Sequence, residues 1–346
     1  MAETIAVAMS GGVDSSVAAL LLRRKGYQVL GLTMLLGGEG SRCCSPGEVK
    51  TARRIAQRLG IPHYTIDLRA SFQKEVVDYF LDEYRRRRTP NPCAVCNRGI
   101  KFGLLLKKAL SLGGRYLATG HYARLEAHNG RVSLKRGIDT QKDQSYFLAR
   151  LDQEALSSIL FPLGGLKKKE VKKLAQELGL PVKDKRESQE VCFLPSEGLA
   201  SFLRERLGGG QTKITDRGGK ILGTTEDPYG YTLGQRRGLK VAGGRPLYVL
   251  EVKPTGEIVL GEEKDLYAKL FWAIQPNWIE EEPKGELRAW VKIRSKQEPS
   301  SALLWPQGER VKVKFDLPQR AITPGQLAVF YQGDRVLGSG WIEEVA

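Results

Sequence analysis

The sequence lacks any long hydrophobic run. Within its 346 residues, apolar stretches such as Val17–Leu22 are far shorter than the about 20 residues that a membrane-spanning helix needs. The first residues, Met1-Ala2-Glu3, also lack the basic segment and apolar core of a secretion signal. We therefore expect no membrane segment and a cytoplasmic protein.

Cysteine and histidine are scarce as well. Five cysteines are an odd number in a chain without a secretion signal, which argues against a disulfide framework and favours metal or redox chemistry. His63 and His128 have no neighbours of a type that would complete a metal site, so we expect core or surface roles for them. The chain also contains no internal repeats and no low-complexity linker.

Acidic residues are outnumbered by basic ones. The chain has 55 Lys and Arg against 39 Asp and Glu, a formal net charge of +16. Basic residues gather in runs at Arg85–Arg88, Lys167–Lys169, Lys172–Lys173 and Arg236–Arg237. Such an excess suits a polyanionic partner such as a nucleic acid. Solvated helix faces or heat adaptation would give the same excess, so charge alone leaves the partner open.

The most informative segment is Thr4–Ser16, TIAVAMSGGVDSS. An apolar strand ends in SGGVDS at residues 10–15, where a helix should begin. The glycine pair allows a sharp turn and close approach to an anion, so the amides of residues 11–15 can bind a phosphate at the helix start. The hydroxyls of Ser10 and Ser15 add donors, and Asp14 can hold a metal ion or cap the helix. The pattern is neither GxxxxGK[ST] nor GxGxxG.

The first half of the chain alternates apolar strands with amphipathic helices. Strands are expected at Val29–Leu35, His63–Asp67 and Arg115–Thr119, and helices at Ser16–Lys25, Glu48–Leu59, Phe72–Arg88, Lys101–Leu110 and within Leu151–Gly179. This alternation predicts an α/β fold with a doubly wound parallel sheet, whose ligands bind beyond the carboxyl ends of the strands. The glycine segment, Met34 and Gly120 would lie at that edge.

The second half of the sequence has a different hydrophobic pattern. From about Gly208, short alternating runs separated by turns predict small β-rich domains, the last of them a β-barrel. The runs are Leu247–Val252, Glu257–Leu260, Leu287–Ile293, Arg310–Phe315 and Leu327–Tyr331. We expect an ATP-binding catalytic domain with a helical part over residues 1–205, a central β-rich domain over 206–267, and a barrel over 268–346.

Residues 89–97, TPNPCAVCN, combine two prolines with a CxxC pair. That spacing lets Cys93 and Cys96 face one point, which suits a metal, an iron–sulfur cluster or a reversible disulfide. Cys192 is the obvious third partner, and a fourth zinc ligand is missing. Three interpretations stay open: a [4Fe-4S] cluster on three cysteines with one iron free for a ligand such as sulfide, a Cys192 persulfide released by Cys96, and buried inert cysteines.

The adjacent pair Cys43-Cys44 cannot easily share one metal. It precedes Ser45-Pro46, which is typical of a helix start, so we expect a structural role.

Six motifs together resemble the tRNA-specific 2-thiouridylases, a family of PP-loop ATP pyrophosphatases. They are SGGVDSS at 10–16, TPNPCAVCNRGIKF at 89–102, ATGHY at 118–122, KDQSYF at 142–147, YTLGQRR at 231–237 and AITPGQ at 321–326. The resemblance covers essentially the whole chain. It implies an enzyme that adenylates O2 of the wobble uridine of tRNA, after which sulfur attacks C2 and releases AMP.

The resemblance also implies cofactors, partners and residue roles. ATP and Mg²⁺ would be required, tRNA would be the substrate, and sulfur would come from a cysteine desulfurase through a persulfide carrier or from inorganic sulfide. Residues that would bind ATP are Ala8, Met9, Ser10, Gly11, Gly12, Val13, Asp14, Ser15, Met34 and Gly120. Residues that would contact tRNA are Asn91, Pro92 and Cys93 at the target base, with His121, Lys142, Asp143, Gln144, Arg294, Ser295 and Gln326 elsewhere. Cys96 and Cys192 match the two catalytic cysteines of the family.

The chain departs from the family pattern at three points. Many members have aspartate at the position of Cys93, and a third thiolate favours a [4Fe-4S] cluster on Cys93, Cys96 and Cys192 over the two-cysteine persulfide route. The histidine usual before the YTxGQR motif is missing, because residues 226–230 read EDPYG. Ser295 stands where an aromatic residue often follows the arginine.

Two other functions compete with this interpretation. Another PP-loop adenylating synthetase, acting on a small molecule, would leave the CxxC pair and the basic excess unexplained. A nucleic-acid-binding or redox protein that has kept the fold would not turn over ATP.

Overall fold

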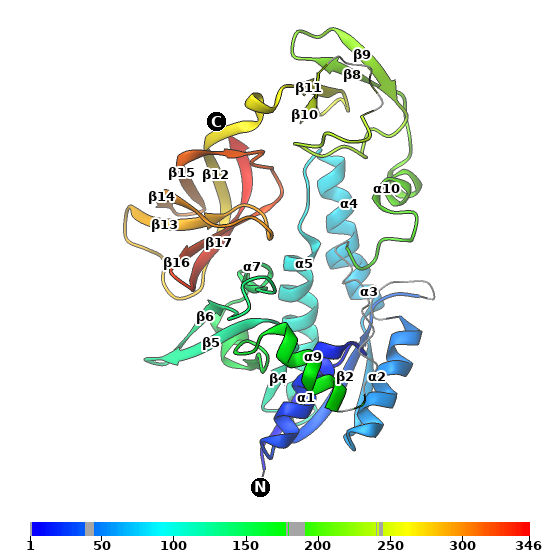
Figure 1. Cartoon of the computed structure of the whole chain (residues 1–346), viewed down its shortest axis with the longest axis vertical. Coiled ribbons are helices and arrows are strands. Elements are labelled where there is room, and N and C mark those ends of the chain that lie inside the picture. The colour runs from blue at the N-terminus through cyan, green and yellow to red at the C-terminus, as the bar shows by residue number, and fades with distance from the viewer. Residues whose placement is uncertain (1, 39–44, 178, 180–190, 240, 242–244) are drawn as a thin grey trace.

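The computed structural model describes residues 2–38, 45–177, 179, 191–239, 241 and 245–346. The structural role expected of Cys43 and Cys44 concerns residues outside these ranges. Three sheets organise the chain (Figure 1): a five-stranded sheet, a four-stranded sheet and an eight-stranded sheet. In the described part of the chain, no helix is long and apolar enough to cross a membrane.

The five-stranded sheet is parallel, with the order β3-β2-β1-β4-β7. Its strands are β1 (Thr4–Ala8), β2 (Gln28–Leu35), β3 (His63–Asp67), β4 (Tyr116–Ala118) and β7 (Ile159–Leu160). Ile5 and Val7 of the central strand pack toward α1 (Val13–Arg24) and α2 (Pro46–Arg58), whereas Ala6 packs toward helices on the other face. Helices on both faces confirm the doubly wound α/β fold.

Two helices of this region differ from their predicted extents. The first runs through α3 (Arg69–Phe72), a π-helical stretch η1 (Gln73–Val77) and α4 (Asp78–Arg85). The second runs through α5 (Pro92–Val95), the π-helical η2 (Cys96–Leu105) and α6 (Leu106–Ser111). It begins at Pro92 rather than Lys101 because proline suits the first helical position and the preceding Asn91 caps the helix. Both cysteines of the CxxC pair are therefore helical.

The carboxyl-terminal part confirms the β-rich prediction. A six-stranded antiparallel barrel is closed by pairing of its first and last strands around buried phenylalanines such as Phe271 and Phe330. Its strands are β12 (Tyr267–Trp278), β13 (Leu287–Lys292), β14 (Ser300–Gln307), β15 (Arg310–Arg320), β16 (Leu327–Gln332) and β17 (Arg335–Val345). The four-stranded sheet has β8 (Thr212–Asp216), β9 (Ile221–Thr225), β10 (Tyr248–Val252) and β11 (Ile258–Gly261).

A hairpin of the first half joins the barrel and was not predicted. It consists of β5 (Ala123–His128) and β6 (Arg131–Arg136), and Lys135 pairs with Arg335 of β17. The region 151–179 is less helical than expected, because β7 separates α8 (Gln153–Ser157) from α9 (Lys168–Glu177). The short helices α7 (Ser145–Leu148), α10 (Leu199–Leu207) and η3 (Glu263–Leu266) complete the elements.

Candidate active site

The glycine loop, residues 10–15, lies at the carboxyl edge of the parallel sheet between β1 and α1. Gly11 has φ +74°, a conformation that residues with a side chain rarely adopt. The Ser15 hydroxyl accepts from the Ser10 amide at 3.2 Å and donates to the Gly12 carbonyl at 3.1 Å. Short-range bonds thus fix the turn, with the first amides of α1 at its end.

Gly120, just beyond β4, closes this edge. A Cβ atom on Gly120 would lie 2.8 Å from the Ser15 amide nitrogen, so a side chain there would displace the helix start. Met34 of β2 and Met9 beyond β1 are both buried. The structure therefore places the predicted ATP residues 8–15 and Gly120 along one edge, with Met34 near the end of the neighbouring strand.

Asp14, the candidate metal ligand, is held by two residues that sequence reasoning missed. The Lys168 ammonium donates to both carboxylate oxygens at 2.7 Å, and the Tyr122 hydroxyl donates to Oδ1 at 2.8 Å. Lys168 begins α9 in the basic run, and Tyr122 ends the ATGHY motif. Since a cation already lies against the carboxylate, the position suits positive charge. Of the two, only Tyr122 was signalled in the sequence, by its motif.

His121 connects the same segment to the cysteine-bearing helix. Its Nδ1 lies 2.7 Å from the Thr119 hydroxyl and its Nε2 lies 3.4 Å from the Lys101 ammonium. Burial, and to a lesser degree the Lys101 charge, lowers the pKa of His121 well below its ordinary value. Lys101 also donates to Asn97 at 2.9 Å, directly after Cys96. The neutral imidazole of His121 therefore connects segment 119–122 to the helix that carries Cys96, through contacts inside the protein.

The proline loop, residues 89–92, leads into this helix. Asn91 is only 5% exposed, and its Oδ1 accepts from the Ala94 amide at 3.2 Å. The Tyr146 hydroxyl lies beside the Asn91 side chain and donates to the Leu327 carbonyl at 2.7 Å. Pro92 is buried, Cys93 is exposed and Cys96 is half-buried. Three motifs distant in sequence therefore meet at the start of α5.

Most other predicted tRNA contacts use their side chains within the protein. The Asp143 carboxylate is 1% exposed and accepts from Arg136 Nε at 3.2 Å and from the Ser145 hydroxyl at 3.0 Å. Gln144 exchanges two hydrogen bonds with the main chain of Tyr122. Lys142 and Ser295 are half-buried.

Arg294 and Gln326 belong to this internally bonded group. The Arg294 guanidinium donates to the Ala321 carbonyl at 2.7 Å and to the Thr323 hydroxyl at 3.1 Å, and burial lowers its pKa. Gln326 donates to the carbonyls of Thr89 and Pro90.

Cys192 is fixed by its neighbour. Phe193 makes edge-on contacts with Phe72 and Phe80 and a tilted contact with Phe202, so the segment packs on α3, α4 and α10. Within the described ranges, which include Cys93, Cys96 and Cys192, no three Cys, His, Asp or Glu side chains gather to hold a metal ion. The predicted three-cysteine ligand set is therefore not preformed.

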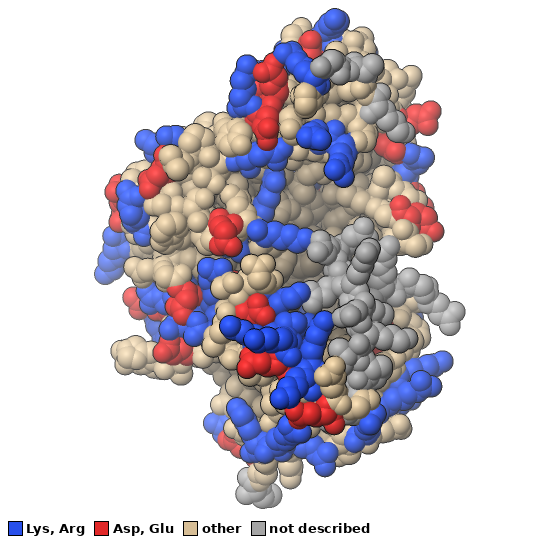
Figure 2. All heavy atoms as spheres, viewed as in Figure 1, with Lys and Arg blue, Asp and Glu red and all other residues tan. Residues whose placement is uncertain are grey.

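The basic runs have unlike surroundings. Arg85 and Arg86 are exposed, whereas Arg87 stacks on the Tyr229 ring at 4.1 Å and donates to the Pro228 carbonyl at 2.8 Å. Figure 2 shows Lys and Arg spread over the viewed face and interspersed with Asp and Glu, with many in the lower half where α1 and α9 lie. Arg87 and Lys168, from two of these runs, thus serve internal contacts.

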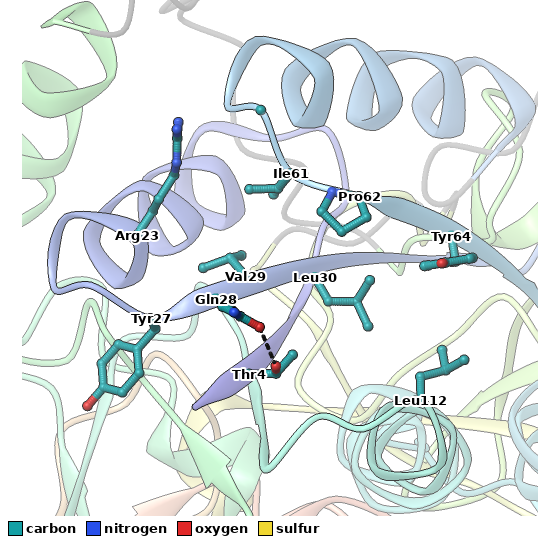
Figure 3. A pocket seen from close by; sticks show the side chains of 11 residues that line it. Thr4, Arg23, Tyr27, Gln28, Val29, Leu30, Ile61, Pro62, Tyr64 and Leu112 are labelled. Carbon is teal, nitrogen blue, oxygen red and sulfur yellow. Dashed lines mark hydrogen bonds between the residues drawn. The ribbon is translucent and has the colours of Figure 1, made fainter. Parts of the chain in front are cut away.

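A hollow of about 460 Å³ lies away from all these residues (Figure 3). It is lined by Arg23, Tyr27, Gln28 and Tyr64 among others, and the Thr4 hydroxyl donates to Gln28 within it at 3.2 Å. Since Thr4 and Gln28 begin their strands, the hollow lies at the amino edge of the sheet, opposite the glycine loop. It contains none of the predicted site residues.

Comparisons with known proteins agree with this picture. Family profiles described as a tRNA methyl transferase HUP domain, a tRNA methyl transferase PRC-barrel domain and an aminomethyltransferase beta-barrel domain match residues 3–196, 200–261 and 268–342. The tRNA-specific 2-thiouridylase MnmA of Carboxydothermus hydrogenoformans is 47% identical over 99% of this chain and 98% of its own. That of Geobacter metallireducens is 46% identical over 99% and 97%.

A solved 4-thiouridine synthetase–RNA complex with ATP is more distant. It matches 51% of this chain and 41% of its own at 18% identity and a TM-score of 0.34, from which nothing further follows.

Proposed function

Because the chain belongs to the tRNA-specific 2-thiouridylase family and is a tRNA sulfurtransferase, we propose that it replaces O2 of the wobble uridine with sulfur. ATP would be converted to AMP and pyrophosphate in the process. One observation carries the proposal: segment 119–122 touches both the glycine loop, through Tyr122 and Asp14, and the cysteine-bearing helix, through His121 and Lys101. The proposed activating site and the proposed sulfur site would thus both be held by segment 119–122.

The glycine loop would perform the activation. A carbonyl oxygen is a poor leaving group, and transfer of AMP to O2 converts it into a good one. The amides of residues 11–15 at the start of α1 would bind the phosphates and stabilise the charge that develops on them. Asp14 would hold Mg²⁺, whose positive charge lowers the cost of phosphate charge, and Lys168 would be released toward the phosphates.

The proline loop would hold the target base. Cys93 is exposed at the first turn of α5, beside the buried Pro92, so a base extruded from the anticodon loop could lie against them. Lys142, Gln144 and Ser295 are our candidates for further tRNA contacts. The basic side chains exposed on the same molecule would attract the phosphates.

Two routes could deliver the sulfur. Three thiolates are the right number for a [4Fe-4S] cluster with an open iron, the form the sequence favours. The described residues do not gather those thiolates into a metal-holding group, so this arrangement does not fit the cluster and we derive no step through it.

The other route uses two cysteines. The terminal sulfur of a Cys192 persulfide attacks C2 and AMP leaves, which joins Cys192 to the base through two sulfurs. The Cys96 thiolate then attacks Cys192 Sγ and releases the thiolated base. The resulting disulfide is reduced by an external thiol.

The reaction is tested with purified protein, ATP, Mg²⁺, a tRNA transcript and either sulfide or a persulfide donor. We expect one AMP for each 2-thiouridine, measured by nucleoside chromatography, and neither product with a transcript that carries a wobble cytidine. Equal AMP formation with both transcripts would refute the proposed substrate.

The sulfur routes are separated by anaerobic purification with assays of iron and acid-labile sulfide. The persulfide route predicts full activity in iron-free protein and in Cys93→Asp, which restores the residue common in the family. Iron bound by the wild type, and lost together with activity in Cys93→Asp, would establish the cluster route instead.

A further inference from the structure

The barrel is bonded directly to the proline loop. Gln326 Nε2 donates to the Thr89 carbonyl at 3.1 Å and to the Pro90 carbonyl at 2.9 Å. The Thr89 amide donates to the Pro324 carbonyl at 2.9 Å. A single side-chain amide therefore spans two successive carbonyls of a loop that lies more than 200 positions away in sequence.

The proline loop depends on such outside partners. Two of its four residues are prolines, which lack an N–H and cannot donate to other parts of the loop. Carbonyls in a partly buried segment need donors, because an unpaired polar group away from water is costly. Gln326 supplies the donor for two of these carbonyls.

The side of the barrel that makes these bonds is itself firmly held. The barrel loop, residues 321–326, receives the Arg294 guanidinium on the Ala321 carbonyl and the Thr323 hydroxyl. The Gly325 amide donates to the Ile342 carbonyl at 2.8 Å, and Ile342 donates back to the Gln326 carbonyl at 2.9 Å. Gln326 is thus presented from a strand-bonded position rather than from a swinging loop.

The two loops are also in close contact. A Cβ atom on Gly325 would lie 2.8 Å from the Thr89 carbonyl oxygen and 3.0 Å from Arg88 Cβ. The side chain of Arg88 in turn pairs with the buried Glu83 at 2.9 Å. The end of α4, the proline loop and the barrel loop therefore form one packed joint.

The residues that follow the proline loop include the candidate sulfur-handling cysteines. Asn91 follows the two bonded carbonyls, caps α5, and so sets where that helix begins. Cys93 lies in the first turn and Cys96 starts η2. A shift of Thr89 and Pro90 would move the cap and, with it, both thiols.

We propose that Gln326 is a positioning residue, whose amide fixes the proline loop so that Cys93 and Cys96 face the target base. The inference rests on the proposed thiolation reaction for its kinetic consequence. Its structural consequence, the placement of Cys93, is independent of that reaction.

The test compares Gln326→Met with Gln326→Ala. Methionine has nearly the shape of glutamine without its donors, so a loss shared by both variants reports the two hydrogen bonds. At saturating tRNA we expect kcat to fall about tenfold, with the Kd for tRNA unchanged within about twofold. Gln307→Met, at an exposed end of β14, is the matched control and should match the wild type in both measurements.

A second measurement needs no tRNA. The rate at which iodoacetamide alkylates Cys93, followed by peptide mass spectrometry, should change in both Gln326 variants while the rate at Cys192 does not. The inference is overturned if either kcat at saturating tRNA or the Cys93 alkylation rate stays within about twofold of wild type. Absence of thiolation by the wild type would instead refute the proposed function and leave the alkylation result to judge the positioning role.

Discussion

The glycine loop and the proline loop are positioned by opposite means. Bonds that shape the turn of the glycine loop join residues at most five positions apart, such as Ser10 and Ser15, and only the outward Asp14 carboxylate has the distant partners Tyr122 and Lys168 described above. Bonds that shape the proline loop reach Gln326, 237 positions from Thr89, and the Thr89 amide donates to the Pro324 carbonyl. The turn of the glycine loop, our candidate for activation, is therefore encoded locally, whereas the proline loop, our candidate for receiving base and sulfur, requires the completed fold.

The contrast predicts different responses to substitution. Changes in the glycine loop should reduce chemistry more than stability, since its turn is shaped by short-range bonds. Changes at the joint between proline loop and barrel should alter stability and chemistry together.

Asp14→Ala, in the glycine loop, should show the largest effect on activity. Loss of the carboxylate removes the candidate Mg²⁺ ligand, and we expect kcat to fall about 10²–10³-fold, the range for loss of one electrostatic stabiliser. AMP release measured in rapid-quench assays checks this. Asp334→Ala, at an exposed turn of the barrel, should keep wild-type AMP release. Normal AMP formation by Asp14→Ala would contradict the assignment.

Gly325→Ala should be the largest perturbation on the long-range side. Its φ of +87° and the 2.8 Å approach to the Thr89 oxygen combine backbone strain with a clash, and we expect unfolding to become about 2–3 kcal/mol easier. Gly333→Ala is a matched control with φ +61° and open space around the added atom. Equal losses of the free energy of unfolding in urea would show that strain alone, without the joint, explains the effect.

Arg87→Ala sharpens the contrast within one basic run. Loss of the stacking on Tyr229 and the bond to Pro228 should lower stability by about 1–2 kcal/mol. Arg85→Ala removes an exposed residue of the same charge and should leave stability almost unchanged. Thermal unfolding of the two variants measures this difference in stability. A larger loss of stability in Arg85→Ala than in Arg87→Ala would contradict the assignment of Arg87 to internal contacts.

The smallest expected effect concerns pH and the link between the two halves. Because the folded protein lowers the pKa of His121 below 6.5, the unfolded chain binds the proton more readily, and stability falls as pH drops through 6.5. His121 can contribute at most about 1.4 kcal/mol per pH unit to the slope of the unfolding free energy against pH. His121→Asn should flatten the dependence of the unfolding free energy between pH 5 and 7 relative to His128→Asn, an exposed control. Parallel curves would show that His121 is not the group responsible.

What the sequence could predict follows the same division. The strand, turn and helix of residues 4–24, the parallel sheet and the barrel follow from hydrophobic period, glycine and turn signals within short windows. The start of α5 at Pro92 was missed, although the Asn91 cap and Pro92 at the first helical position are local signals.

Contacts across the fold could not be predicted in this way. Lys168 reaches Asp14 across 154 positions, and no pattern within the basic run singles it out. Likewise, motif matching predicts that Gln326 and Asp143 contact RNA, but a motif does not reveal the hydrogen bonds that these side chains make within the protein.

The order of synthesis gives the joint at Gln326 a further consequence. At about 5–20 residues per second, a ribosome would take roughly 10–50 s to add the 237 residues that separate Thr89 from Gln326. During that time a nascent chain could already form its glycine loop and sheet, while the turn ahead of Cys93 lacks the amide that fixes it. A chain released before Gln326 would thus be able to hold nucleotide before its thiols are in place, and only translation beyond Gln326 would couple the two.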